Sequence, residues 1–467
     1  MARVVVVGAG VSGLTAAWQL AQDLPAGDEV EVLEAAAHVG GVLQRRDVGG
    51  LTVDVGAESV LARRPEATGL AAELGLDLVH PATTRASLAT EDGLRPLPAG
   101  TVMGVPRTAD SVRGLLAAAD VDRVRDEPSH PAAPLEHDVS VARYVADRVG
   151  PAVVDRLVEP LLGGVYAGHA AQLSLRATVP ALWAHARRGG SLLAGLGPAP
   201  APSTAPVFAG LAGGLARLPL VLAERLRARG VAVRTGTPVT RLERTPTGWL
   251  VDGTPADAVV LAVPAPVAAR LLAAAVPAAA AELREVVTAG VVIAALAVPA
   301  GQLAGLAGSG VLVPPVVGAA QGLRAKALTL SGNKWDWVGR QSRDLAVLRV
   351  SLGRAGEGEA LEADDADVVR WAAEDAGRLL GRPLRPVDHA VVRWADGLPQ
   401  YAVGHVDRVA RLRAAVAATG RLAVCGSVLD GVGVPACVAA ARRAAAEVTA
   451  QLAGRPGAEA GAVTARG

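Results

Sequence analysis

Residues 4–13 read Val4-Val5-Val6-Val7-Gly8-Ala9-Gly10-Val11-Ser12-Gly13, and a helical stretch begins near Leu14. The short valine run predicts a buried strand, and the GxGxxG spacing predicts a tight turn into the helix. Gly8 permits the turn, Gly10 lets a pyrophosphate approach the backbone, and Gly13 lets the helix pack on the strand. Phosphates would then lie at the positive end of the helix. The alternative for these six residues alone is an ordinary tight turn.

The next predicted strand supports the dinucleotide hypothesis. It covers Glu29 to Leu33 and ends in Glu34, twenty-one residues after Gly13. An acidic side chain at this position can accept hydrogen bonds from ribose hydroxyls, and it would repel the extra phosphate of NADP. Residues Arg3 to Glu34 therefore predict a βαβ unit that binds a dinucleotide.

Length and charge limit the fold and the partners. The 467 residues exceed what one hydrophobic core supports, which predicts two or three lobes. The 46 basic and 45 acidic residues leave a net charge of +1, so we expect no nucleic-acid partner. Only Lys326 and Lys334 are lysines, and the remaining basic residues are arginines, which indicates a GC-rich genome.

The cysteines and the apolar runs indicate a cytoplasmic protein. Cys425 and Cys437 are the only cysteines, which argues against a disulfide framework. The first residues lack the long apolar core of a signal peptide. The uncharged stretch from Val286 to Leu323 contains ten glycines and prolines, so it predicts a buried strand followed by loops and no transmembrane segment. Peripheral contact with a membrane is left open.

Other segments give a coarse secondary structure. Apolar spacing predicts helices between Asp138 and Leu162, with Asp138 or Ser140 as the cap, and an alanine-rich helix over Pro435 to Leu452. Gly189 to Ala216 predicts a long loop between lobes, and the residues after Gly454 a frayed tail. Short valine-rich strands are expected at Val231 to Val233, Ala258 to Val263, Val286 to Val298 and Leu345 to Ser351.

Two later motifs identify a family. Gly40-Gly41 follows Glu34 by six residues, and Asp54-Val55-Gly56-Ala57-Glu58 comes next. This order resembles the amine-oxidase-like flavin oxidases, which implies FAD in place of NAD. In that family the glycine pair is commonly flanked by arginine or lysine, whereas here the flanking residues are His38 and Val42. One cationic contact to FAD is therefore missing from the pattern.

Four longer blocks narrow the resemblance to the oxygen-dependent coproporphyrinogen III and protoporphyrinogen oxidases. The match extends from about residue 3 to about residue 452. The blocks are Gly56-Ala57-Glu58-Ser59 with Arg63-Arg64-Pro65, Glu159 to Gly168, Trp394 to His405, and Gly431 to Cys437.

The resemblance implies the residues that hold one noncovalent FAD. The glycines before Val434 would precede a helix whose N–H groups point at the flavin ring, although a glycine turn alone also explains them. In the segment Thr237-Pro238-Val239-Thr240, Val239 would pair with adenine through its backbone. The predicted FAD-binding residues are Gly8, Ala9, Gly10, Val11, Ser12, Gly13, Glu34, Ala35, Gly40, Gly41, Val42, Gly56, Ala57, Glu58, Ser59, Val239, Trp394, Gly426, Val432, Gly433 and Val434.

The resemblance also implies three substrate-binding residues. Gly164 and Tyr166 would line the tetrapyrrole cavity, and Arg85 would hold a propionate. Read without the family, Tyr166 is a core residue and Arg85 a solvated charge. Lys334 is expected to be exposed, and His405 to be a packing residue. No catalytic side chain and no metal site are predicted, because the cofactor carries the chemistry and the common catalytic motifs are missing.

The expected fold is α/β, with a Rossmann-type FAD domain built from discontinuous segments, a mixed-sheet substrate domain and a helical insertion. The expected boundaries are 1–77, 206–285 and 389–452 for the FAD-binding domain, 78–105 and 286–388 for the substrate domain, 106–205 for the helical insertion and 453–467 for a flexible tail.

The resemblance implies a six-electron oxidation of a porphyrinogen, with O2 reduced to H2O2, in heme biosynthesis. An actinobacterial source, suggested by the GC-rich composition, favours coproporphyrinogen III over protoporphyrinogen IX. An amine oxidase, a carotenoid desaturase and a flavin carrier without turnover are the alternatives. The expected partners are the porphyrinogen, O2 and a downstream enzyme of the heme pathway.

Overall fold

The computed structural model describes residues 1–198 and 205–453. The valine run forms β1 (Arg3–Val7), which is buried and pairs on both sides with parallel strands. Because every strand of this sheet is parallel, the carboxyl ends of all five meet at one edge. The strand order is β10 (Ala232–Arg234), β2 (Glu29–Leu33), β1, β14 (Ala258–Leu261) and β20 (Leu422–Val424).

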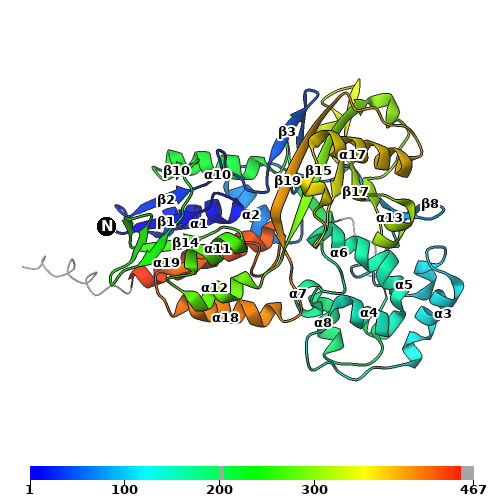
Figure 1. The fold of residues 1–467 in the computed structure, drawn as a ribbon, viewed down its shortest axis with the longest axis horizontal. Helices are drawn as coiled ribbons and strands as arrows, with labels where there is room; N and C mark the ends of the chain where they lie inside the picture. Colours follow the sequence, from blue (N-terminus) through cyan, green and yellow to red (C-terminus); the bar gives the residue numbers. More distant parts are fainter. Residues whose placement is uncertain (199–204, 454–467) are drawn as a thin grey trace, which may run out of the picture.

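Helices cover the parallel sheet and join the two ends of the chain. The long apolar helix α19 (Val434–Ala453) packs along α1 (Val11–Asp23), which also contacts α10 (Arg217–Ala228) (Figure 1). One hydrophobic cluster runs through these helices and the sheet. The remaining helices beside it are α2 (Pro65–Glu73), α11 (Ala265–Leu272), α12 (Pro277–Arg284) and α18 (His405–Ala417). Three small sheets complete the strands in this part of the molecule. One pairs β3 (Arg45–Val48) with β4 (Leu51–Asp54), and in a second β9 (Phe208–Leu211) lies between β5 (Val60–Leu61) and β6 (Leu78–Val79). The third has the order β11 (Leu242–Arg244), β12 (Trp249–Val251) and β13 (Thr254–Ala256).

A second sheet of seven strands has mixed directions. Its order is β19 (Asp388–Pro399), β15 (Thr288–Pro299), β18 (Leu345–Leu352), β17 (Ala325–Leu330), β16 (Gly310–Leu312), β7 (Ala86–Thr90) and β8 (Gly93–Pro96). Neighbours are antiparallel except β16 and β7, which are parallel. One face packs on α17 (Asp365–Leu380) through its own apolar cluster. Short helices α13 (Pro315–Gln321), α14 (Ser331–Lys334), α15 (Asp336–Gly339) and α16 (Glu359–Glu362) connect the strands.

Helices dominate residues 118–196, which lie below the seven-stranded sheet in the view of Figure 1. They are α3 (Ala118–Asp126), α4 (Val141–Val149), α5 (Pro151–Val153), the π-helical turn Val154–Val158, α6 (Glu159–Tyr166), α7 (Leu175–Thr178), α8 (Pro180–Ala186) and α9 (Leu192–Leu196). Ser140 caps α4 by accepting a hydrogen bond from the Arg143 N–H. These helices share a third cluster. The α/β class with a discontinuous parallel sheet, a mixed sheet and a helical insertion is confirmed.

Two predicted loops prove to be partly ordered. The segment from Gly189 to Ala216 was expected to be loop throughout, but it contains α9 and β9, because Ser191 caps the helix and β9 pairs with β5 and β6. Residues 199–204 of that segment lie outside the described residues. The stretch from Val286 to Leu323 forms β15 as predicted, then adds β16 and α13 where only loops were expected. Of the helices in the described ranges, none is long and apolar enough to cross a membrane. The predicted tail after Gly454 also lies outside the described residues.

Candidate functional site

The glycine loop lies between the end of β1 and the start of α1. Gly8 has φ +102°, and a Cβ there would come within 2.5 Å of the Ala262 carbonyl oxygen. A Cβ on Gly13 would lie 1.8 Å from the Gly8 carbonyl oxygen, so Gly13 allows the helix to pack on the loop. A Cβ on Gly10 would meet only the Gly41 Cα, at 4.0 Å. Gly10 is therefore the position where the loop leaves open space for a ligand.

Glu34 and the glycine pair reach this loop from β2. The Glu34 carboxylate accepts hydrogen bonds from the Ala9 N–H at 2.6 Å and the Ala36 N–H at 2.8 Å. The Gly40 N–H donates to the Ala9 carbonyl oxygen at 2.8 Å. The structure thus brings Glu34 and Gly40 to the loop, while Ala35 is exposed at the strand end. The carboxylate retains lone pairs that could accept from ribose hydroxyls.

The residues predicted to bind adenine and the flavin ring have separate surroundings. The Thr237 N–H donates to the Glu34 carbonyl oxygen at 2.8 Å, which places the segment of Val239 beside β2. Near the predicted flavin ring, a Cβ on Gly56 would lie 1.7 Å from the Val42 carbonyl oxygen and 3.6 Å from the Trp394 ring. The Trp394 indole N–H donates to the Val55 carbonyl oxygen at 3.2 Å. Val42 is 41 % exposed, a large apolar side chain without cover.

Glu58 lies in a buried ion triplet that links the segment between β4 and β5 to α14 and β18. Its carboxylate contacts the Lys334 ammonium at 2.5 Å and the Arg349 guanidinium at 2.7 Å. Arg349 also donates to the Gly56 carbonyl oxygen at 2.9 Å. Burial alone would raise the pKa of Glu58, but the two cations outweigh it and hold the pKa below its usual range. The triplet carries one surplus positive charge.

The prediction that Lys334 is exposed is wrong. Its side chain is 17 % exposed, because Glu58 provides a carboxylate partner in the interior. Arg349 was not among the residues predicted for the site. The signal was present in the sequence, since an arginine in the middle of a valine-rich strand has to find a partner.

The C-terminal loop brings flavin and substrate candidates together. Gly426 has φ +125° and no heavy atom within 4 Å of its Cβ position, and Val432 and Gly433 precede α19, which begins at Val434. The Tyr401 hydroxyl donates to the carbonyl oxygen of Ser427, next to Gly426. The Tyr401 ring lies 5.7 Å from that of Tyr166.

Tyr166 closes α6 at the boundary between the helical segment and this loop. It is buried, and burial raises the pKa of its hydroxyl to about 12. Val432 packs against the same apolar cluster as Tyr166. The side chain therefore belongs to the core and also borders the loop of the predicted flavin ring.

Arg85 and Gly164 both lie beside the seven-stranded sheet, Arg85 at the start of β7 and Gly164 on α6. Arg85 directly precedes β7, where Ala86 pairs with Gly310, and its guanidinium is exposed. Two residues along β16, the Leu312 side chain lies 3.8 Å from the Cβ position of Gly164. Gly164 of α6 thus faces β16 two residues from the Gly310 that pairs with Ala86, and the described residues show no direct contact between Arg85 and Gly164.

One face of this sheet carries small, half-buried residues that the sequence did not identify. The pairing aligns Ala86, Gly310 and Thr329 in one row, which continues to Arg349. Interior strands are normally covered on both faces, but the first three of these residues are only partly buried. A row of partly exposed residues therefore runs from the position after Arg85 to Arg349 of the ion triplet.

His405 is a packing residue in the structure. It is 1 % exposed, stacks on the Tyr401 ring at 3.9 Å, and contacts the Leu429 carbonyl oxygen through Nε2 at 3.3 Å. Burial lowers the pKa of its imidazole to about 4. These contacts support the structural role predicted for it.

The residues at the sheet edge fit a dinucleotide cofactor. The open space at Gly10, the start of α1 without a side-chain cap and the Glu34 carboxylate match what a pyrophosphate and a ribose require. The glycine loop, Glu34 and Gly40 hence meet at one edge of the parallel sheet. Their individual contacts to FAD stay predictions.

Comparisons with known proteins agree with this geometry. Residues 11–449 match the family model for flavin containing amine oxidoreductases. The chain is 43 % identical over 457 residues to the coproporphyrinogen III oxidase of Mycobacterium tuberculosis strain H37Rv, covering 96 % of this chain and 97 % of that protein. It is 29 % identical to the coproporphyrinogen III oxidase of Bacillus subtilis, with coverage of 96 % and 98 %.

A solved structure with a similar fold comes from Exiguobacterium sp. 255-15 and is described as a candidate protoporphyrinogen oxidase. The TM-score is 0.84, the sequences are 32 % identical, and the match covers 96 % of this chain and 99 % of that one. The chain is therefore a flavin-family oxidoreductase and belongs to the coproporphyrinogen III and protoporphyrinogen oxidase branch of the flavin containing amine oxidoreductases.

Proposed function

We propose that this protein is an FAD-dependent oxidase of heme biosynthesis that converts coproporphyrinogen III to coproporphyrin III. The observation that carries the proposal is the 43 % identity to a curated coproporphyrinogen III oxidase over nearly the whole of both chains. The meeting of the Gly426 loop with Tyr166 supports it, because a substrate beside Tyr166 would lie next to the predicted flavin ring.

The reaction balances with oxygen as the acceptor. FAD supplies the chemistry that accepts a hydride from a methylene bridge of the porphyrinogen while a pyrrole nitrogen loses a proton. Three such oxidations remove six hydrogens, and three O2 become three H2O2. We assign no catalytic acid or base to this chain.

The chain's own residues would bind and orient the two ligands. The glycine loop and Glu34 would hold the pyrophosphate and a ribose, while the surplus positive charge beside Glu58 would favour negative charge near the ring. Arg85 would receive a propionate, since its guanidinium is exposed and suits a carboxylate bidentately. Gly164 would leave room for the macrocycle beside Leu312.

We further propose that FAD is bound noncovalently, because both cysteines, Cys425 and Cys437, are buried in the protein core. Denaturation should release the flavin into the supernatant. Flavin that remains with precipitated protein would contradict this.

The expected domain boundaries stay proposals that the separate hydrophobic clusters support. The unpaired cysteines also suit the cytoplasm as the proposed location.

The experiment that tests the function is aerobic turnover with each porphyrinogen, followed by porphyrin fluorescence and peroxide release. We expect faster turnover with coproporphyrinogen III. A preference for protoporphyrinogen IX would instead support the activity described for the Exiguobacterium structure. An amine oxidase or a carotenoid desaturase would produce no porphyrin, and a carrier would produce no peroxide.

A further inference from the structure

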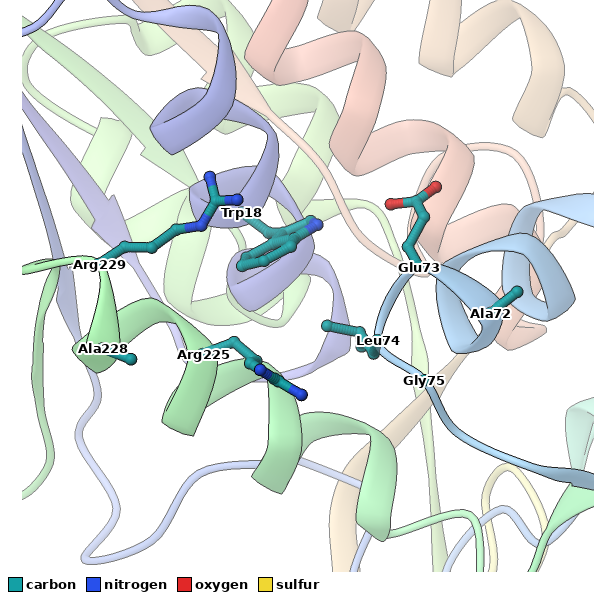
Figure 2. Close-up of a pocket in the computed structure, with 8 residues that line it drawn as sticks. All are labelled: Trp18, Ala72, Glu73, Leu74, Gly75, Arg225, Ala228 and Arg229. Atoms are coloured by element: carbon teal, nitrogen blue, oxygen red, sulfur yellow. The ribbon is translucent and has the colours of Figure 1, made fainter.

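A surface hollow lies away from the candidate active site, where α1 meets the ends of α2 and α10. Its volume is about 490 Å³ (Figure 2). The side chains that form most of its wall are Trp18, Glu73, Leu74, Arg225 and Arg229. Trp18 is seven residues beyond the start of α1, which is about 10 Å along the helix axis. The hollow is thus separate from the glycine loop at the N-terminal end of that helix.

The hollow carries surplus positive charge. Arg225 and Arg229 are one helical turn apart, which places their Cβ atoms about 6 Å from each other. Both are exposed, and in the described part of the chain neither has a carboxylate partner. The carboxylate of Glu73 does not neutralise them, because it pairs with Arg442 of α19. Figure 2 shows Arg229 extending from α10 to the Trp18 ring, while Arg225 extends from the same helix toward the side of the hollow where Leu74 and Gly75 lie.

Trp18 adds a donor that lacks an acceptor. Its side chain is 7 % exposed, and within the described ranges its indole N–H has no hydrogen-bond partner. Buried donors are nearly always paired, so an orphan donor beside a hollow indicates a missing acceptor. The nitrogen side of the ring faces Glu73 and Leu74 (Figure 2). The Arg229 guanidinium lies 4.6 Å above the ring centroid and holds it in place.

We propose that this hollow binds a small oxyanionic molecule, either a dicarboxylate or a phosphate. The two guanidinium groups match carboxylate and phosphate oxygens in a bidentate geometry, and the indole N–H can donate to a further oxygen. Each arginine can receive one oxyanionic group, so a dicarboxylate can bridge the two and a phosphate can bind at either one. Leu74 provides an apolar side for the carbon chain of a dicarboxylate.

The test is calorimetric titration of the full-length flavin-loaded protein with glutarate and, separately, with inorganic phosphate. Sodium chloride keeps the ionic strength constant, so that screening is the same throughout. We expect saturable binding of one ligand per chain and a rise in Tm. The ligand that binds more tightly identifies the source of the oxyanion. Trp18→Phe keeps the aromatic ring and removes the donor, so it should weaken binding several-fold.

The variant Arg225→Gln/Arg229→Gln should weaken binding about tenfold or more, because charge-assisted hydrogen bonds are lost. The matched control is Arg227→Gln, an exposed arginine of the same helix outside the wall of the hollow, which should bind like the original chain. Flavin content and circular dichroism check that each variant is folded. The proposal is overturned if neither ligand saturates in the millimolar range, or if the double variant binds as well as the control.

Discussion

Glu58→Gln should destabilise the protein more than any exposed ion pair does. The change removes the negative charge between Lys334 and Arg349 while keeping the size of the side chain. The three side chains are 11 %, 17 % and 9 % exposed, so water screens them little. Breaking a buried ion pair by removing one partner costs about 3–5 kcal/mol, because the remaining charges are left without compensation. That is a large part of the stability of a typical domain.

Urea unfolding followed by circular dichroism measures this loss. The matched control is Glu91→Gln, which breaks an exposed pair with Arg156 at a similar distance of 2.7 Å and should cost about 1 kcal/mol or less. Glu58→Gln/Lys334→Met restores the original net charge of the cluster and should regain part of the loss. An equal effect of Glu58→Gln and Glu91→Gln would refute the account of the triplet.

The pH dependence of the triplet has a definite sign. The pKa of Glu58 is lowered in the folded protein, so its stabilisation is present above the unfolded pKa of about 4.3 and is lost as the pH falls through the folded value.

Three further predictions concern the site. Gly10→Val should fold but lose its flavin, because a side chain there meets no protein atom closer than 4.0 Å and enters the space for the ligand. Gly13→Val should fail to fold, because its Cβ would lie 1.8 Å from the Gly8 carbonyl oxygen. The flavin absorbance of the purified protein tests both variants. Arg85→Ala should raise the KM for coproporphyrinogen roughly ten- to a hundredfold without changing the amount of bound flavin. Unchanged kinetics would show that Arg85 is a solvated charge that does not contact the substrate. The pKa of His405 is lowered by burial to about 4, so stability should fall by about 3 kcal/mol as the pH drops from about 6.5 to 4; His405→Phe keeps the stacking on Tyr401 and should remove this dependence in denaturation curves.

The local part of the site could be predicted from the sequence. Strand, glycine turn and helix follow one another within twenty residues, and the roles of Gly8 and Gly13 depend on backbone geometry that only glycine allows. The cap at Ser140 and the start of α19 could also be predicted, because each depends on residues that are close in the sequence. Periodicity and turn chemistry operate over these short distances.

The parts that were missed depend on contacts between distant residues. Lys334 and Arg349 meet a carboxylate that is 276 and 291 positions away, so no local pattern shows that they are paired. The neighbourhood of Arg85 likewise follows from the pairing of Ala86 with Gly310. The block that contains Tyr401 was found by resemblance alone, and its link to Ser427 required the structure.

The parallel sheet has a consequence for synthesis in the cell. Its edge strand β20 and the helix α19 come from the last tenth of the described chain, yet they pack on β14 and α1. At about 5–20 residues per second, the ribosome needs roughly 20–80 s to reach residue 420 after making β1. During that time the apolar flank of α1 has no α19 to cover it. The apolar surface that α19 covers in the folded protein is therefore exposed on the nascent chain, and the parallel sheet is complete only once β20 has been made.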